Sequence, residues 1–171
     1  MRSLVFAALA AVSLVALPAL AADDQMVTVS PEQIGQIFCI SRLGNDEAVI
    51  SGLIGPELQA AIADAEAKDD AWAKEYPGDK PPMGDGIPWT FAPDYAAKCD
   101  IGKVTLTDTE ARVELHYGFP EYPDANYTDV LVLKRVDQPG FDTGFWRIDN
   151  IVYPDGTDLR TALIQIFEGL I

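Results

Sequence analysis

The sequence predicts an α+β fold: N-terminal helices packed on a curved four-stranded antiparallel sheet (a meander), with one further helix at the C-terminus. Between residues 30 and 76, and again after residue 157, apolar residues recur every three or four positions. Between residues 99 and 153, apolar and polar residues alternate instead. The first spacing is typical of helices with one buried face, and the second of strands. Helices followed by a run of strands favour an α+β fold over a parallel α/β sheet.

Residues 1–21 have the features of a signal peptide. Arg2 supplies a positive start, and the apolar run that follows is short for a membrane span. Residues 19–21, Ala-Leu-Ala, then offer the small side chains that a signal peptidase recognises. We therefore expect cleavage after Ala21, with an uncleaved anchor as the alternative.

The remaining chain is long enough for one domain with its own core. We expect a lead-in over residues 22–29 and a single domain over residues 30–171. No later segment of the sequence is long and apolar enough to cross a bilayer. The mature protein is therefore predicted to be periplasmic, with secretion into the medium as the alternative.

The first helix has a well-defined start at Ser30. Ser30 can cap the helix, Pro31 suits its first position, and Gln33 completes a capping box. Gly44 is the expected end. The residues predicted on its buried face are Ile34, Ile37, Phe38 and Ser41.

Two further helices are expected before the long loop. Asn45 is predicted to cap a short helix that ends at Ile54, with Ile50 and Leu53 also turned inward. Gly55 and Pro56 then open a third helix, which ends at the Pro-Gly pair of residues 77–78. The side chains spaced along its apolar face are Leu58, Ile62, Ala65, Asp69, Trp72 and Tyr76. The Pro- and Gly-rich residues 76–94 are predicted to form a loop inside the domain.

The four strands are expected at residues 99–107, 111–119, 127–136 and 144–153. In the second strand, Val113, Leu115, Tyr117 and Phe119 are predicted on one face, with Arg112, Glu114 and His116 on the other. The third strand is apolar on both faces around residues 131–133, which places it inside the sheet.

The segment FWRIDNIVYPDGTDLRTAL closes the fold. Trp146, Ile148 and Val152 are predicted to share the buried face of the fourth strand, opposite Arg147 and Asp149. The Pro-Asp-Gly of residues 154–156 is typical of a turn. A last helix then starts at Thr157 or Asp158. Its predicted apolar stripe comprises Leu159, Ala162, Leu163, Ile166, Phe167 and Leu170.

Cys39 and Cys99 are the cysteines of the chain. In an exported protein, two cysteines are expected to form a disulfide, with two free thiols as the alternative. This bond would join the first helix to the start of the sheet. No Cys-X-X-Cys motif is present in the sequence, which argues against a thiol-redox enzyme.

The formal charge of −15 narrows the classes of partner. Nucleic acid is disfavoured because binding it requires a basic patch, and the sequence has none. An acidic surface promotes solubility, and it can also steer a cationic protein partner toward the molecule. Acidic stretches suited to the second role lie at residues 63–75 and 121–129.

The order of elements resembles the nuclear transport factor 2-like superfamily. The specific part is Trp-Arg-Ile-Asp-Asn-Ile at residues 146–151, followed by Thr-Asp-Leu-Arg-Thr-Ala-Leu at residues 157–163. These residues are similar to a motif in small exported bacterial proteins to which no function is assigned. The resemblance implies a cone-shaped α+β domain with a pocket at its wide end. Superfamily members include isomerases, dehydratases, small-molecule binders and protein-binding modules, so the fold does not select a function.

Aromatic residues gather in two segments, the loop after the third helix and the second hairpin. If both lie at the open end of the cone, they line an apolar pocket with acidic rims. Alternatively, they close the core beneath the loop. The candidate ligand-binding residues are Trp72, Tyr76, Trp89, Phe91, Tyr95, Tyr117 and Phe119. The ligand would be a small apolar or polar molecule.

The alternatives to a binding protein are weaker on sequence grounds. An isomerase or dehydratase needs an acid–base group beside a carbonyl-polarising donor. The candidates are His116, Asp149 and Tyr117, but His116 and Tyr117 point to opposite faces of one strand. Asp79 and Asp85 lack the spacing of a calcium loop, and we expect neither a metal nor a cofactor. The other alternative function is an acidic inhibitor that binds a cationic envelope protein. As a separate point, residues 131–133 are apolar on both faces of the strand, which is compatible with a homodimer.

Overall fold

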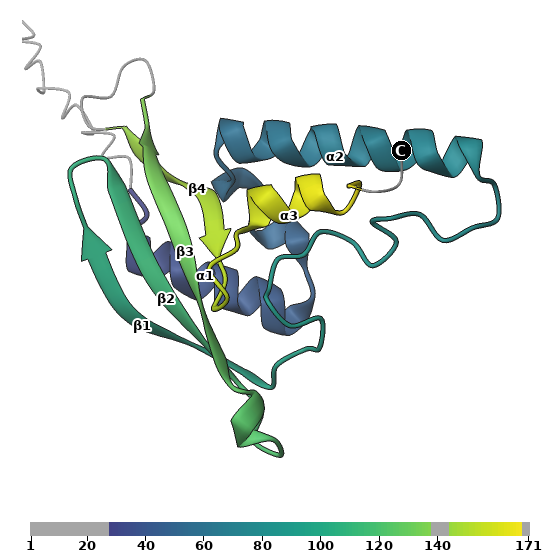
Figure 1. The fold of residues 1–171 in the computed structure, drawn as a ribbon. Helices are drawn as coiled ribbons and strands as arrows, with labels where there is room; N and C mark the ends of the chain where they lie inside the picture. The colour runs from purple at the N-terminus through teal and green to yellow at the C-terminus, as the bar shows by residue number, and fades with distance from the viewer. Residues whose placement is uncertain (1–27, 138–143, 169–171) are drawn as a thin grey trace, which may run out of the picture.

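The alternating half of the sequence forms one antiparallel sheet in the computed structural model, which describes residues 28–137 and 144–168. Its strands are β1 (Lys98–Leu106), β2 (Glu110–Gly118), β3 (Tyr127–Val136) and β4 (Phe145–Val152), in the order β1-β2-β3-β4 (Figure 1). The predicted α+β class and the meander are confirmed. The predicted signal peptide, most of the lead-in and Leu170 lie outside the described residues.

Helix α1 (Pro31–Gly44) lies against β1 and β2 on the concave side of the sheet (Figure 1). Ser30 and Gln33 form the predicted capping box, with the Gln33 backbone N–H donating to Ser30 Oγ at 3.3 Å. Ile34 and Phe38 are fully buried. The capping chemistry and the apolar spacing therefore specify both the start of this helix and its packed face.

The predicted second helix is replaced by two short 3₁₀ turns, η1 (Glu47–Val49) and η2 (Ser51–Leu53). Asn45 caps the end of α1 instead, in the left-handed region with φ 49°, a conformation that asparagine tolerates better than most residues. Asp46 takes the predicted capping role and accepts the N–H of Ala48 at 3.0 Å. Ile50 is nevertheless fully buried, as predicted.

Helix α2 (Pro56–Glu75) begins and ends close to its predicted bounds. Leu58, Ile62 and Ala65 are buried, whereas its last turns extend past the sheet (Figure 1). Tyr76, the residue after the helix, is consequently 41 % exposed. Within residues 28–137 and 144–168, no helix is both long and apolar enough for a membrane span.

Strand β2 follows the predicted alternation, with Val113, Leu115 and Tyr117 buried. Strand β3 pairs with β2 and β4, which confirms its internal position. The prediction for Val152 was wrong. The pairing of β3 with β4 shifts between Val132 and Leu133, so that Asp149 is an extra residue in β4. Such a bulge reverses the alternation after it.

The bulge therefore turns Ile151 into the core in place of Val152. Trp146 is 7 % exposed and Ile148 is fully buried, as predicted. Helix α3 (Leu159–Gln165) follows, with Asp158 accepting the Thr161 N–H at 3.1 Å as its cap. This helix packs on α2 and β4.

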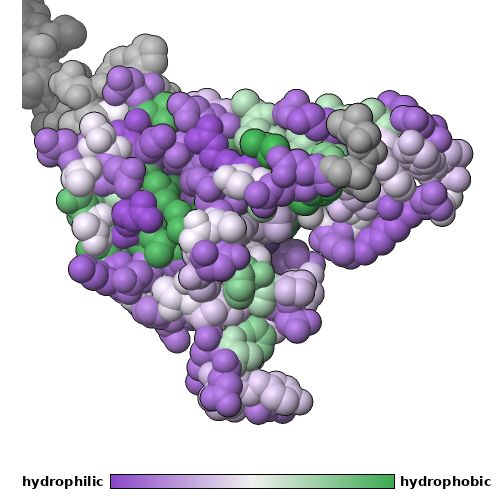
Figure 2. Space-filling model, viewed as in Figure 1, coloured by the Kyte–Doolittle hydropathy of each residue, from purple (hydrophilic) through white to green (hydrophobic). Residues whose placement is uncertain are grey.

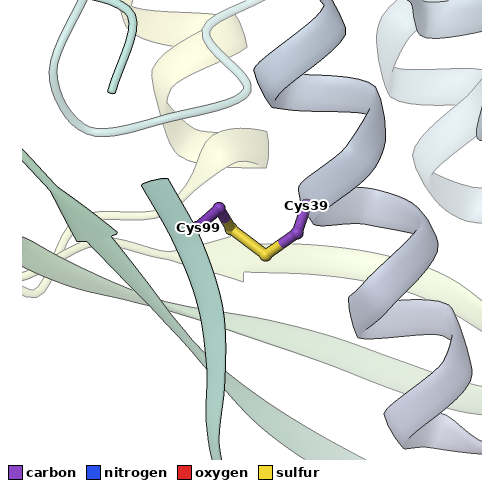
Figure 3. The surroundings of a disulfide bond; sticks show 2 residues. All are labelled: Cys39 and Cys99. Atoms are coloured by element: carbon purple, nitrogen blue, oxygen red, sulfur yellow. A yellow bond between two sulfur atoms is a disulfide. The ribbon is translucent and has the colours of Figure 1, made fainter. Parts of the chain in front are cut away.

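Cys39 and Cys99 form the predicted disulfide, which joins α1 to β1 (Figure 3). Their Cα atoms are 5.3 Å apart, which is within the usual range for disulfides. Because Cys39 is buried, the bond lies at the edge of the core rather than on the surface. It fixes the C-terminal half of α1 against the sheet.

Replacing Gly35 by alanine is expected to lower the free energy of unfolding by about 1 kcal/mol. A Cβ atom there would lie 2.8 Å from Val113 Cγ1 and 3.2 Å from Ile101 Cγ2. Overpacking costs roughly 1–3 kcal/mol, which outweighs the gain of about 1 kcal/mol in helix propensity. Gly44→Ala is the matched control, because nothing lies within 4 Å of its added Cβ. Urea unfolding should show Gly35→Ala below, and Gly44→Ala at or above, the wild-type stability.

Candidate functional site

The loop between α2 and β1, residues 76–97, crosses the open side of the fold, and we call it the strap (Figure 1). Distant elements hold it by hydrogen bonds. Asp69 accepts the Met83 N–H at 2.7 Å, and Glu47 accepts the Trp89 indole N–H at 2.8 Å. The hydroxyl of Tyr153 donates to the carbonyl of Pro88. The strap is therefore tied to α2, η1 and the end of β4.

A cavity of about 250 Å³ lies between the strap, the C-terminal end of α1 and the inner face of β2 and β3. Trp89 and Tyr117, each 3 % exposed, belong to the packed interior. Phe91 and Tyr95 line the same cavity but are 45 % and 70 % exposed. The cavity thus combines a buried aromatic floor with aromatic side chains left in water.

The structure brings together four of the sequence-predicted aromatic residues, Trp89, Phe91, Tyr95 and Tyr117. Trp72 and Tyr76 are not part of the cavity wall. Their rings pack against each other at a tilt at the end of α2, with centroids 4.9 Å apart and an interplanar angle of 38°. Phe119 packs against Tyr127 at 6.1 Å and borders a separate small hollow. A ligand-binding role for these residues remains a prediction.

Sequence reasoning missed Arg42, whose side chain is only 9 % exposed and lines the cavity. Its guanidinium lies 5.6 Å from the Phe38 ring centroid and 5.4 Å from that of Trp89. It also donates to Ser41 Oγ at 2.9 Å. Burial lowers the pKa of Arg42, while Glu47 acts in the opposite direction. Arginine is common on the exposed side of the last turn of a helix. The sequence position of Arg42 therefore does not reveal that it is buried beside the cavity.

Tyr117 forms the floor of the cavity from β2. Its ring stacks on that of Tyr127, the cross-strand partner in β3, with centroids 4.9 Å apart. Burial raises the pKa of Tyr117 strongly, so its hydroxyl stays protonated near neutral pH. Burial also raises the pKa of Tyr127 to about 12. The Tyr117 hydroxyl finds no hydrogen-bond partner in the described part of the chain.

Asp129 is a second residue that sequence reasoning missed. It is fully buried on the inner face of β3, where one carboxylate oxygen accepts the Phe91 N–H of the strap at 3.3 Å. Its other oxygen has no partner among residues 28–137 and 144–168. Burial raises the pKa of Asp129 to about 7. The alternation offered a clue, because Asp129 shares a strand face with Tyr127 and Leu131.

The catalytic candidates from the sequence lie elsewhere. His116 is exposed on the outer face of β2, where its Nδ1 and Thr128 Oγ1 are 2.8 Å apart. Asp149 forms ion pairs with Lys134 at 3.1 Å and with Arg160 at 3.5 Å. Of the three candidates, only Tyr117 lines the cavity. The described residues contain no group of three His, Cys, Asp or Glu side chains suited to a metal ion.

Comparison of the chain with protein-family models, curated proteins and solved structures gave no match. The resemblance to the nuclear transport factor 2-like superfamily therefore stays a prediction.

Proposed function

We propose that this chain is an exported, non-enzymatic binding protein that holds a small molecule in the cavity under the strap. The observation that carries the proposal is the exposure of Leu43, Phe91 and Tyr95, at 45 %, 45 % and 70 %, around one aromatic cavity. If these side chains only closed the core, they would be buried. Exposed apolar groups gathered around a concave site favour ligand binding.

The nuclear transport factor 2-like resemblance supports the same proposal, because it implies a pocket at the wide end of a cone. Export follows from the predicted signal peptide at residues 1–21. The volume of about 250 Å³ indicates a small ligand, because sites for drug-sized molecules usually exceed roughly 300 Å³. Polar side chains such as Arg42 and Tyr117 would orient such a ligand.

Tyr95→Ala is expected to weaken binding of a fluorescent apolar probe about 5- to 20-fold, because it removes an aromatic contact surface from the mouth of the cavity. Tyr122→Ala is the matched control. Tyr122 is 69 % exposed, almost the same as Tyr95, but it is not part of the cavity lining. Fluorescence titration measures both. Absence of saturable binding, or equal losses in the two variants, would refute the proposed site.

The natural ligand can be sought by native mass spectrometry of the protein purified from its own envelope. A bound small mass that disappears in Tyr95→Ala and persists in Tyr122→Ala supports the proposal. A protein that carries a second polypeptide and no small mass points instead to the second candidate function.

That second candidate is inhibition of a cationic envelope protein. Helix α2 extends past the sheet with Glu66, Asp70 and Glu75 exposed, and the visible surface there is mostly hydrophilic (Figure 2). Complementary charge gives fast association that weakens with salt. A pull-down from envelope extract at low and high salt distinguishes the functions, since a salt-sensitive protein partner favours the inhibitor.

A further inference from the structure

Two hydrogen-bond donors in the cavity wall lack partners among the described residues. They are Arg42 Nε and the hydroxyl of Tyr117. Both atoms are buried, and both side chains line the cavity. More than nine in ten buried polar groups in proteins are paired, and an unpaired one is costly. Two unpaired donors beside one cavity therefore point to a ligand that supplies hydrogen-bond acceptors.

The charge of Arg42 is also incompletely balanced. The nearest carboxylate among the described residues is that of Glu47, whose Oε1 lies 3.9 Å from Arg42 Nη1. The same oxygen accepts the Trp89 indole N–H at 2.8 Å. Ser41 contributes a neutral hydroxyl, and the guanidinium also lies over the rings of Phe38 and Trp89. A buried cation whose single ion pair is long and shared costs free energy, which an anionic ligand would recover.

Building on the proposed function, we propose that the ligand is a small organic carboxylate with an apolar body. The carboxylate accepts hydrogen bonds from Arg42 and Tyr117, and the apolar body lies against Phe91 and Tyr95 at the mouth. Arginine matches the planar, two-oxygen geometry of a carboxylate. An apolar cavity of about 150 Å³ accommodates benzene, so about 250 Å³ has room for one ring and a carboxylate.

The same contacts disfavour a cationic ligand. A ligand cation would meet the guanidinium of Arg42, and Arg42 already occupies the region over the Trp89 ring. Asp85, one of the acidic residues at the rim, is neutralised by Lys80 at 2.6 Å. Glu47 and Asp94 also line the cavity, so the selection against positive charge rests on Arg42.

The formal charge of −15 predicts how the association rate of the ligand changes with ionic strength. The protein repels an anion at long range, and salt screens that repulsion. The association rate for a carboxylate should therefore rise with ionic strength. A cationic partner would show the opposite dependence.

Benzoate, benzamide and benzamidinium test the inference, because they are planar analogues of nearly the same shape with negative, zero and positive charge. Calorimetric titration of the full mature protein should show benzoate binding tightest. Tyr117→Phe should weaken benzoate binding roughly 10- to 100-fold, which corresponds to the loss of one hydrogen bond to a charged group. Its thermal midpoint should not fall, since only an unpaired hydroxyl is removed.

Arg42→Gln should abolish the preference for benzoate over benzamide. Tyr122→Phe and Arg112→Gln, at an exposed tyrosine and an exposed arginine outside the cavity, should leave it unchanged. If Arg42→Gln does not fold, the benzoate affinity of Tyr117→Phe alone tests the carboxylate inference. The carboxylate inference is overturned if benzamide or benzamidinium binds at least as tightly as benzoate, if Tyr117→Phe keeps full affinity, or if none of the three binds. The proposed function is judged separately, by the apolar probe.

Discussion

Replacing Cys39 and Cys99 together by alanine should lower the free energy of unfolding by roughly 4 kcal/mol. The disulfide closes a loop across a sequence separation of 60 residues, and removing it gives the unfolded chain more conformational freedom. That cost is a large part of the total stability of a small domain, which is roughly 5–15 kcal/mol. Urea unfolding of the oxidised wild type and of the double variant measures the difference.

Reduction of the wild type by a thiol reagent provides the control. The reduced wild type should unfold close to the double alanine variant, apart from the small packing change at buried Cys39. A double variant as stable as the oxidised protein would show that the bond does not constrain the unfolded chain. The consequence extends to the cavity, because Arg42 lies one turn after Cys39 on α1.

Asp129→Asn is expected to raise stability at alkaline pH relative to the wild type. Burial raises the pKa of Asp129 from its ordinary value of 3.8 to about 7. Between these pH values, the folded protein keeps a proton that the unfolded chain has lost. The unfolded state then binds fewer protons, so wild-type stability falls as pH rises from about 4 to 7. Above pH 7 this loss is complete, and asparagine, which does not titrate, avoids it.

The size of the pKa shift of Asp129 determines how large the stability difference between Asp129→Asn and the wild type should be. A change of about three pKa units corresponds to roughly 4 kcal/mol. The unfolding free energy of Asp129→Asn minus that of the wild type should therefore rise by up to that amount between about pH 4 and pH 8. Urea titrations at several pH values measure this difference. A pH-independent difference would mean that Asp129 has the same pKa in both states.

Asp155→Asn is a control variant whose stability difference from the wild type should change with pH in the opposite direction. Hydrogen bonds from the hydroxyl and the backbone N–H of Thr157 lower the pKa of exposed Asp155. Its ionised form therefore stabilises the fold at pH values above the ordinary value, and this contribution is lost as pH falls through the lowered pKa. For Asp155→Asn, the difference from the wild type should become less favourable as pH rises. Opposite slopes for the two variants would exclude a general charge effect.

Several parts of the fold were predictable because their causes are local. The Ser30 capping box and Gly44 set the bounds of α1, and the period-two pattern of β2 set its buried face. The disulfide was predictable from the number of cysteines in a chain that is predicted to be exported. The exchange of Val152 for Ile151 was not, because a bulge depends on pairing with β3 rather than on the sequence of β4 itself.

The candidate site was predictable only in part. The aromatic composition of the strap pointed to Trp89, Phe91 and Tyr95, but the same reasoning also selected Trp72 and Tyr76, which lie outside the cavity. Helical spacing placed those two on the apolar face of α2. It could not reveal that the helix extends past the sheet that would have buried them.

The amino-acid sequence by itself determined the class of fold, the order of its elements and the disulfide, because capping, periodicity and cysteine chemistry act over short stretches of chain. Only the tertiary structure decided which polar groups lost their water. Arg42 looks ordinary in sequence, and the alternation places Asp129 only on the inner face of its strand. The burial of both groups also depends on the strap, which is distant in sequence from each of them. Desolvation depends on every element that covers a group, so no local pattern encodes it.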